Sequence, residues 1–463
     1  MVKIQFFRQR KLYKYQANSS LSSSCFPRKQ SIRYGVSVCI VTSMFHIRPA
    51  KPTPLELKHL SDVDDQEGLR FQVPIMLFYH SNPSVQPKNP VHLIQQALAQ
   101  ALVFYYPFAG RLVEGPNRKL SVNCTGEGVL FTEADADVEL PRLGVEVGNP
   151  YLAELLHDVP GSSGILGCPL LLIQVTRFRC GGFVVAVRVN HTMSDAPGIV
   201  QFLNTVAEFA RGGGAEAKML PTLPPVWKRE VLSARWPPRV MCFHQEFEQR
   251  ASVTLSDYCQ QADMVHGTFF FGPKEIRAIQ SQLPEKCTIF VALTACLWRT
   301  RIRALGFDPD ETIHIPAGYY GNAFAYPASV ARAVTLATEP LDYAVGLVKA
   351  AKAQMSEKYI QSVADFLVTK GRALYKARGN FIVSDTSRAG LDGLDFGWGM
   401  PEYGGPVAGT GPICFYERYK GGGADGRVVM LCLPRPAMER FKRELNEITR
   451  EERASERLIK SSL

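Results

Sequence analysis

His191 and Asp195 are the pair of residues best suited to acid–base chemistry, because they stand four positions apart in the run His-Thr-Met-Ser-Asp. An unperturbed imidazole has a pKa of about 6.5, so the His191 ring can take a proton from a hydroxyl group at neutral pH. The spacing alone is weak evidence, since about 0.5 such pairs are expected by chance in this chain. A core histidine with a hydrogen-bonded ring therefore stays open as the alternative.

A rarer constellation is the run Asp395 to Gly399, Asp-Phe-Gly-Trp-Gly. Its glycines permit a tight turn or a close backbone approach, which an ordinary surface loop does not require beside a tryptophan. The alternative is a packed loop that buries Trp398. The Asp-Phe-Gly triplet also occurs in protein kinases, but the chain lacks the other loops of that class. It equally lacks the G-x-S-x-G, H-E-x-x-H and P-loop runs of hydrolases, zinc peptidases and NTPases.

The elements around His191 are predicted to place it at the end of a strand, facing the N-terminus of a helix. Two largely buried strands are expected at residues 169–178 and 183–190, and His191 follows the second directly. Ser194 or Asp195 then suits the N-cap of a helix that ends at three glycines. Strand ends that open onto helix N-termini are where α/β folds place their sites.

A proline-punctuated stretch with little periodicity, residues 216–250, divides the chain into two parts. Residues 46–215 and residues 251–463 each mix strand and helix patterns, and each contains one of the two motifs. We therefore predict an α/β fold of two domains joined by a long crossover loop.

The excess of positive charge is confined to the start of the chain. Residues 1–55 contain ten basic side chains and no acidic one, which leaves 43 of each sign over residues 56–463. A neutral body lacks the positive field that nucleic-acid binding uses, so we predict no nucleic-acid partner. A small basic pocket for one anionic cofactor stays possible.

Residues 1–45 are basic and rich in serine, and we predict a disordered or targeting extension outside the fold. A transit peptide would direct the protein to a plastid. A start at Met44 is a further alternative.

Composition excludes several other classes. No apolar run approaches the ~18 residues of a membrane span, so we expect a soluble protein without a membrane partner. Eleven cysteines without a C-x-x-C pair indicate free thiols in a reducing compartment and no metal site.

The order of the two motifs, one in each half, resembles the plant BAHD acyltransferase family. Tyr106 to Leu112 and Gly318 to Asn322 match its Y-P-[LF]-A-G-R-L and G-Y-x-G-N segments. Leu60 to Asp65, followed by Arg70 to Gln72, is similar to the branch that esterifies benzyl alcohol, methanol and other small alcohols, with benzoyl-, acetyl- or anthraniloyl-CoA as donors. The resemblance runs from about Lys51 to the C-terminal helix.

This resemblance implies two chloramphenicol-acetyltransferase-like domains with mixed sheets and a channel between them. Acyl-CoA is then the co-substrate and His191 the general base, with no acyl-enzyme, no permanent cofactor and no metal. Asp395 is grouped with His191 as a catalytic-motif residue, although its role in the family is mainly structural. The family implies a monomeric, cytoplasmic enzyme of ester biosynthesis in plant secondary metabolism. The resemblance also implies a structural role for Asp195, as the partner in an ion pair, and for the motif residues Gly397, Trp398 and Gly399. It further implies that three residues line the substrate channel: Tyr320, Asn322 and Phe324.

The chain departs from the family just before Gly318. Relatives carry a strand with an N-x-R motif there, whose arginine is expected to pair with a motif aspartate, whereas here Thr312 to Ala317 runs directly into Gly318. A buried carboxylate without its cation is costly. Either a substitute supplies the charge, or the chain is a catalytically impaired relative that binds acyl-CoA or a partner. The candidate substitutes are His314, Arg299, Arg301 and Arg303.

Overall fold

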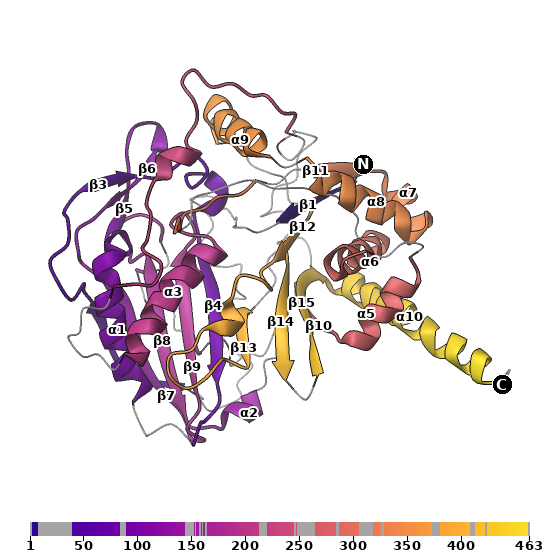
Figure 1. The fold of residues 1–463 in the computed structure, drawn as a ribbon, viewed down its shortest axis with the longest axis horizontal. Helices are drawn as coiled ribbons and strands as arrows, with labels where there is room; N and C mark the ends of the chain where they lie inside the picture. Colours follow the sequence, from indigo (N-terminus) through magenta and orange to yellow (C-terminus); the bar gives the residue numbers. More distant parts are fainter. Residues whose placement is uncertain are drawn as a thin grey trace.

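The computed structural model describes most of the chain (Figure 1). The described residues are 2–7, 39–83, 89–143, 152, 154–156, 159, 161–162, 164–212, 220–244, 247, 264–283, 287–304, 318–325, 328–354, 356–372, 380–407, 413–421 and 424–461.

The first sheet has six strands in the order β13-β4-β9-β8-β7-β2. Its β7 and β8 run parallel, and its other neighbours run antiparallel. Every residue of β9 is buried, in agreement with the apolar run that predicted this strand. The strands are β2 (Cys39–Ile47), β4 (Gln72–Tyr79), β7 (Val129–Ala136), β8 (Leu171–Phe178), β9 (Phe183–Asn190) and β13 (Tyr403–Pro406).

The second sheet has six strands in the order β10-β15-β14-β12-β1-β11. Here β12 pairs in parallel with both β14 and β1, and the remaining pairs are antiparallel. Both large sheets are therefore mixed, which confirms the predicted α/β class. The strands are β1 (Val2–Phe7), β10 (Met264–Phe271), β11 (Ala328–Ala331), β12 (Asn380–Asp385), β14 (Ile413–Gly421) and β15 (Ala424–Pro434).

Helices cover the sheets, and the first and second halves of the chain lie side by side (Figure 1). In the first half, α1 (Pro90–Phe104) and α3 (Ala196–Arg211) share a core with the first sheet. A small sheet of β3 (Leu57–His59), β5 (Arg111–Glu114) and β6 (Leu120–Asn123) lies beside them. The remaining α-helices that the structure describes are α2 (Leu140–Leu143), α5 (Pro273–Ser281), α6 (Ile289–Ala304), α7 (Ala333–Thr338), α8 (Leu341–Lys352), α9 (Glu357–Thr369) and α10 (Arg435–Ser461). The short 3₁₀ helices among the described residues are η1 (Glu67–Leu69), η2 (Tyr106–Ala109), η3 (Pro116–Arg118), η5 (Arg229–Leu232) and η7 (Leu391–Gly393).

Two parts of the predicted N-terminal extension differ from expectation, because they are strands of the two large sheets. β1 lies in the interior of the second sheet, between β11 and β12, and β2 pairs with β7 at an edge of the first. Met44 lies within β2. The sequence prediction missed these two strands because the basic, Ser-rich composition of residues 1–45 outweighed the short strand patterns at either end of that segment. Residues 8–38 lie outside the described part of the chain.

The crossover of the chain is described over residues 220–244, where Val226 forms an isolated bridge with Tyr319. The predicted domain boundaries at 215/216 and 250/251 fall outside the described residues. One strand crosses the predicted division, since β13 from the second half pairs with β4 in the first sheet. Among the helices that the structure describes, none has the length and apolarity to cross a membrane.

Candidate active site

His191 lies at the end of β9, as the sequence predicted, and its side chain is buried. Its backbone N–H donates to the carbonyl oxygen of Phe71, over 2.8 Å. The Phe71 ring also lies against the imidazole, with ring centroids 5.2 Å apart. Backbone and ring of the candidate base are thus both held by the residue that precedes β4.

The turn after His191 is held by short-range hydrogen bonds. Thr192 donates from its N–H and hydroxyl groups to the side-chain oxygen of Asn190. Asp195 is the N-cap of α3, and its Oδ1 accepts from the N–H of Gly198 over 2.7 Å. A side chain at Gly198 would overlap the Tyr320 carbonyl and the Ser194 hydroxyl. The cap agrees with a structural role for Asp195, while the family's ion pair for this residue stays a prediction.

The proposed replacements for the family's arginine are only partly described. The stretch before Gly318, with His314, lies outside the described residues, as does the side chain of Arg303. Arg301 is buried in the second half, where its guanidinium lies 5.0 Å from the ring centroid of Phe381 in β12.

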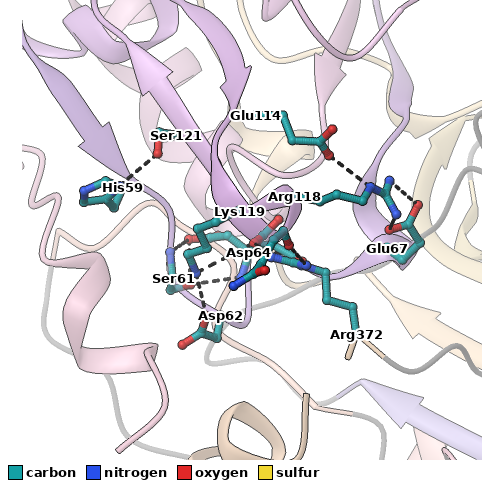
Figure 2. A network of polar contacts seen from close by, with 12 residues as sticks. His59, Ser61, Asp62, Asp64, Glu67, Glu114, Arg118, Lys119, Ser121 and Arg372 are labelled. Atoms are coloured by element: carbon teal, nitrogen blue, oxygen red, sulfur yellow. Dashed lines mark hydrogen bonds and ion pairs between the residues drawn. The ribbon is translucent and has the colours of Figure 1, made fainter. Parts of the chain in front are cut away.

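A buried polar cluster lies beside the turn and is centred on Asp64. Its Oδ1 accepts from Nη1 of Arg229 over 2.9 Å, and from the backbone N–H and the side-chain amide of Asn322 over 2.9 and 2.8 Å. Its Oδ2 accepts from the N–H and the hydroxyl of Ser61. Figure 2 shows Asp64 and Ser61 within a wider network that includes Lys119 and Asp62. Segments far apart in sequence therefore meet at one carboxylate.

This cluster contacts the backbone of the His191 turn at two carbonyl groups. Nη2 of Arg229 donates to the carbonyl oxygen of Met193, and the side-chain amide of Asn322 donates to that of His191, both over 2.8 Å. Burial disfavours the charged guanidinium, but the Asp64 carboxylate, together with the side chains of Tyr319 and Tyr320, raises the pKa of Arg229 overall, so the guanidinium stays protonated.

The three predicted channel residues all lie in buried positions. Asn322 belongs to the cluster just described. Tyr320 packs against Tyr105 and Phe108, with ring centroids 5.1 and 5.7 Å apart. Phe324 lies in a core cluster that contains residues of both halves of the chain. Their role in lining a channel stays a prediction.

The Asp-Phe-Gly-Trp-Gly run forms a packed loop. The Asp395 carboxylate accepts from the N–H groups of Gly397 and Gly399, over 2.7 and 2.9 Å. Both glycines have left-handed backbone angles, φ 110° and 93°, which explains why glycine stands there. These contacts are those of a structural loop.

The rings of this loop pack at the far end of β9 from His191. Phe396 contacts Tyr79 and Trp398 contacts Phe183, with ring centroids 5.8 and 5.1 Å apart. Phe183 begins β9 and His191 follows its end, so about 25 Å of extended chain separate them. The structure does not bring Asp395 together with His191, and a catalytic part for Asp395 stays a prediction.

Sequence reasoning missed Arg229 and gave Asp64 and Phe71 no role. Arg229 lies in the aperiodic crossover, where no hydrophobic pattern marks a buried residue. Within the described residues, no group of three or more His, Cys, Asp or Glu side chains is placed to hold a metal ion.

The chain is similar to acyltransferases over nearly its whole length. The sequence model of the Transferase family matches residues 38–448. Alcohol acyltransferase 16 of Actinidia chinensis var. chinensis is 57% identical over 427 residues, covering 88% of this chain and 92% of the relative. Benzyl alcohol O-benzoyltransferase of Nicotiana tabacum is 51% identical over 425 residues, covering 86% and 91%.

Two solved structures share the fold. Vinorine synthase matches with a TM-score of 0.68 at 19% identity, covering 89% of this chain and 98% of the solved chain. F. graminearum TRI101, complexed with coenzyme A and deoxynivalenol, matches with a TM-score of 0.62 at 16% identity, covering 84% and 97%. These likenesses confirm the expected two-domain architecture.

Proposed function

Since this chain belongs to the Transferase family, the BAHD acyltransferases, we propose that it transfers an acyl group from an acyl-CoA thioester to the hydroxyl group of an alcohol. The observation that carries the proposal is the placement of His191. Its imidazole lies at a strand end, in a turn whose backbone is held by Phe71 and Asn322.

The chemistry follows from the imidazole. Neutral His191 accepts the proton of the alcohol hydroxyl while the oxygen attacks the thioester carbonyl, and a tetrahedral oxyanion forms. Its collapse breaks the carbon–sulfur bond and expels the CoA thiolate. The imidazolium returns the proton to that thiolate, so the products are an ester and free CoA. No acyl-enzyme and no metal ion takes part.

We propose small alcohols such as benzyl alcohol and methanol as acceptors, and benzoyl-, acetyl- or anthraniloyl-CoA as donors. The 51% identity with a benzyl alcohol O-benzoyltransferase supports this choice. The same family membership underlies our proposal of a monomeric, cytoplasmic enzyme of plant ester biosynthesis. The plastid alternative requires a cleaved transit peptide, whereas residues 2–7 form β1 within the second sheet. The comparisons give no support to the catalytically impaired alternative.

The test is release of free CoA thiol from a panel of acyl-CoA donors with pooled alcohols. We expect alcohol-dependent thiol release by the wild-type chain and a loss of at least about 100-fold in His191→Ala, since general-base catalysis contributes 10²–10⁴-fold. Circular dichroism confirms that the variant is folded. Alcohol-dependent release by a folded His191→Ala at the wild-type rate would refute the assignment of the base. The absence of thiol release by a folded wild-type chain would refute the proposed function.

A further inference from the structure

One buried guanidinium connects the crossover of the chain to the turn that carries His191. Arg229 is 2% exposed and Asp64 is fully buried. The same guanidinium donates to the Asp64 carboxylate through Nη1 and to the Met193 carbonyl through Nη2. The ion pair therefore also fixes a backbone group two residues after the candidate base.

The groups around Arg229 fix the position of its guanidinium. Its Cζ lies 4.4 Å from the ring centroid of Trp227, 5.4 Å from that of Tyr319 and 5.2 Å from that of Tyr320. A side chain at Gly321 would overlap the guanidinium itself. The glycine of the G-Y-x-G-N segment thus leaves the space that Arg229 fills.

The turn is held at two carbonyls by groups that share one acceptor. Asn322 donates to the His191 carbonyl and Arg229 to the Met193 carbonyl, while both also donate to Oδ1 of Asp64. Loss of Arg229 would free the Met193 carbonyl and leave Asp64 without this cation. The position of the His191 backbone depends on the same carboxylate.

We infer that Arg229 is a positioning residue for His191, which rests on the proposed function. It acts through the turn and touches no reacting atom. A catalytic group displaced by 1 Å can cost about 100-fold in rate, so the expected signature is a loss of kcat with little change in KM.

A second ion pair on the same crossover supplies a matched control. Arg235 donates from its backbone N–H and Nε to Asp365 in α9, over 2.7 and 2.8 Å, and Asp365 is fully buried. Within the described part of the chain, Arg235 bonds to Asp365, Arg239 and Met241, and none of these bonds reaches the His191 turn. The Arg235 side chain is 33% exposed and that of Arg229 is 2% exposed, so the two pairs differ in burial. Arg235→Lys nevertheless makes the same substitution in an ion pair of the same crossover without loosening that turn.

The experiment compares Arg229→Lys with Arg235→Lys in the full-length chain. Lysine keeps a positive charge for Asp64, but it lacks the rigid planar fork whose two nitrogens reach Asp64 and the Met193 carbonyl separately. We expect Arg229→Lys to lower kcat about 10- to 100-fold, with KM for acyl-CoA and for the alcohol within about twofold of wild type. Arg235→Lys should keep kcat within about twofold. Both are assayed well below their thermal midpoints.

Hydrogen–deuterium exchange gives a readout independent of turnover. Peptides that cover residues 188–200 should exchange at least about tenfold faster in Arg229→Lys and at the wild-type rate in Arg235→Lys. Wild-type kcat or unchanged exchange in Arg229→Lys would overturn the inference, as would an equal loss of kcat in Arg235→Lys. A wild-type chain without thiol release would refute the proposed function and with it the effect on kcat, whereas the exchange comparison would still decide whether Arg229 holds the His191 turn.

Discussion

Asn322→Asp is the sharpest perturbation of the buried cluster, because it replaces a donor by an acceptor without changing the size of the side chain. The amide nitrogen of Asn322 donates to Oδ1 of Asp64 and to the carbonyl of His191, both over 2.8 Å. In the variant, two carboxyl groups face each other at hydrogen-bond distance. Buried carboxylates this close cannot both ionise, so one of them keeps a proton in the folded state.

The expected cost has two parts. The His191 carbonyl loses its donor, which costs about 1–3 kcal/mol. Keeping a carboxyl protonated costs about 1.4 kcal/mol for each pH unit above its pKa in the unfolded chain. Since the pKa of that carboxyl is raised on folding, its contribution to stability is complete below the unfolded pKa of about 4 and is lost as pH rises. The variant should therefore be destabilised by up to about 3 kcal/mol more at pH 7.5 than at pH 5.5.

Urea titrations at the two pH values measure this difference. Tryptophan fluorescence is a suitable signal, because Trp227 packs on Arg229 within the cluster. Asn322→Ala is the control, since it removes the same donor without adding a carboxyl group. We expect it to cost about 2–4 kcal/mol at both pH values. Equal destabilisation of Asn322→Asp at pH 5.5 and pH 7.5, relative to wild type, would refute the geometry of the cluster.

Two further predictions concern packing and thiol reactivity. Gly198→Ala places a methyl group against the Tyr320 carbonyl and should lower the free energy of unfolding by about 1–3 kcal/mol in urea titrations, whereas Gly393→Ala, with open space around it, should change it little. An effect of Gly393→Ala as large as that of Gly198→Ala would contradict this. Burial raises the pKa of the Cys124 thiol to about 12, so iodoacetamide at pH 8 should leave Cys124 unmodified in the folded protein and modify it only after unfolding. Peptide mass spectrometry would detect the modification, and rapid labelling of folded protein would show that the thiol is accessible.

The features of the fold and the site that the sequence predicted correctly are those that depend on residues close together in the chain. The apolar run at residues 183–190 defined β9, and the strand placed His191 at its end. The prediction of Ser194 or Asp195 as N-cap was also confirmed, since Asp195 caps α3. Capping depends on residues within one turn of each other, so a local pattern is enough to find it.

The features that the sequence did not predict depend on contacts between segments that are far apart in the chain. Nothing near Arg229 in the sequence shows that its guanidinium meets Asp64, 165 residues earlier. The pairing of β13 with β4 and the insertion of β1 between β11 and β12 have the same cause. Strand partners are chosen by the packing of whole sheets, which periodicity within one strand does not reveal.

The interior place of β1 also has a consequence for synthesis of the chain. β1 spans residues 2–7, whereas its neighbours β11 and β12 begin at Ala328 and Asn380. At 5–20 residues per second, the ribosome takes about 15–65 s to produce β11 after β1 has been made. Throughout that interval β1 has neither of its sheet partners. The second sheet can therefore close only late in translation, and a nascent-chain chaperone that shields β1 would favour its correct assembly.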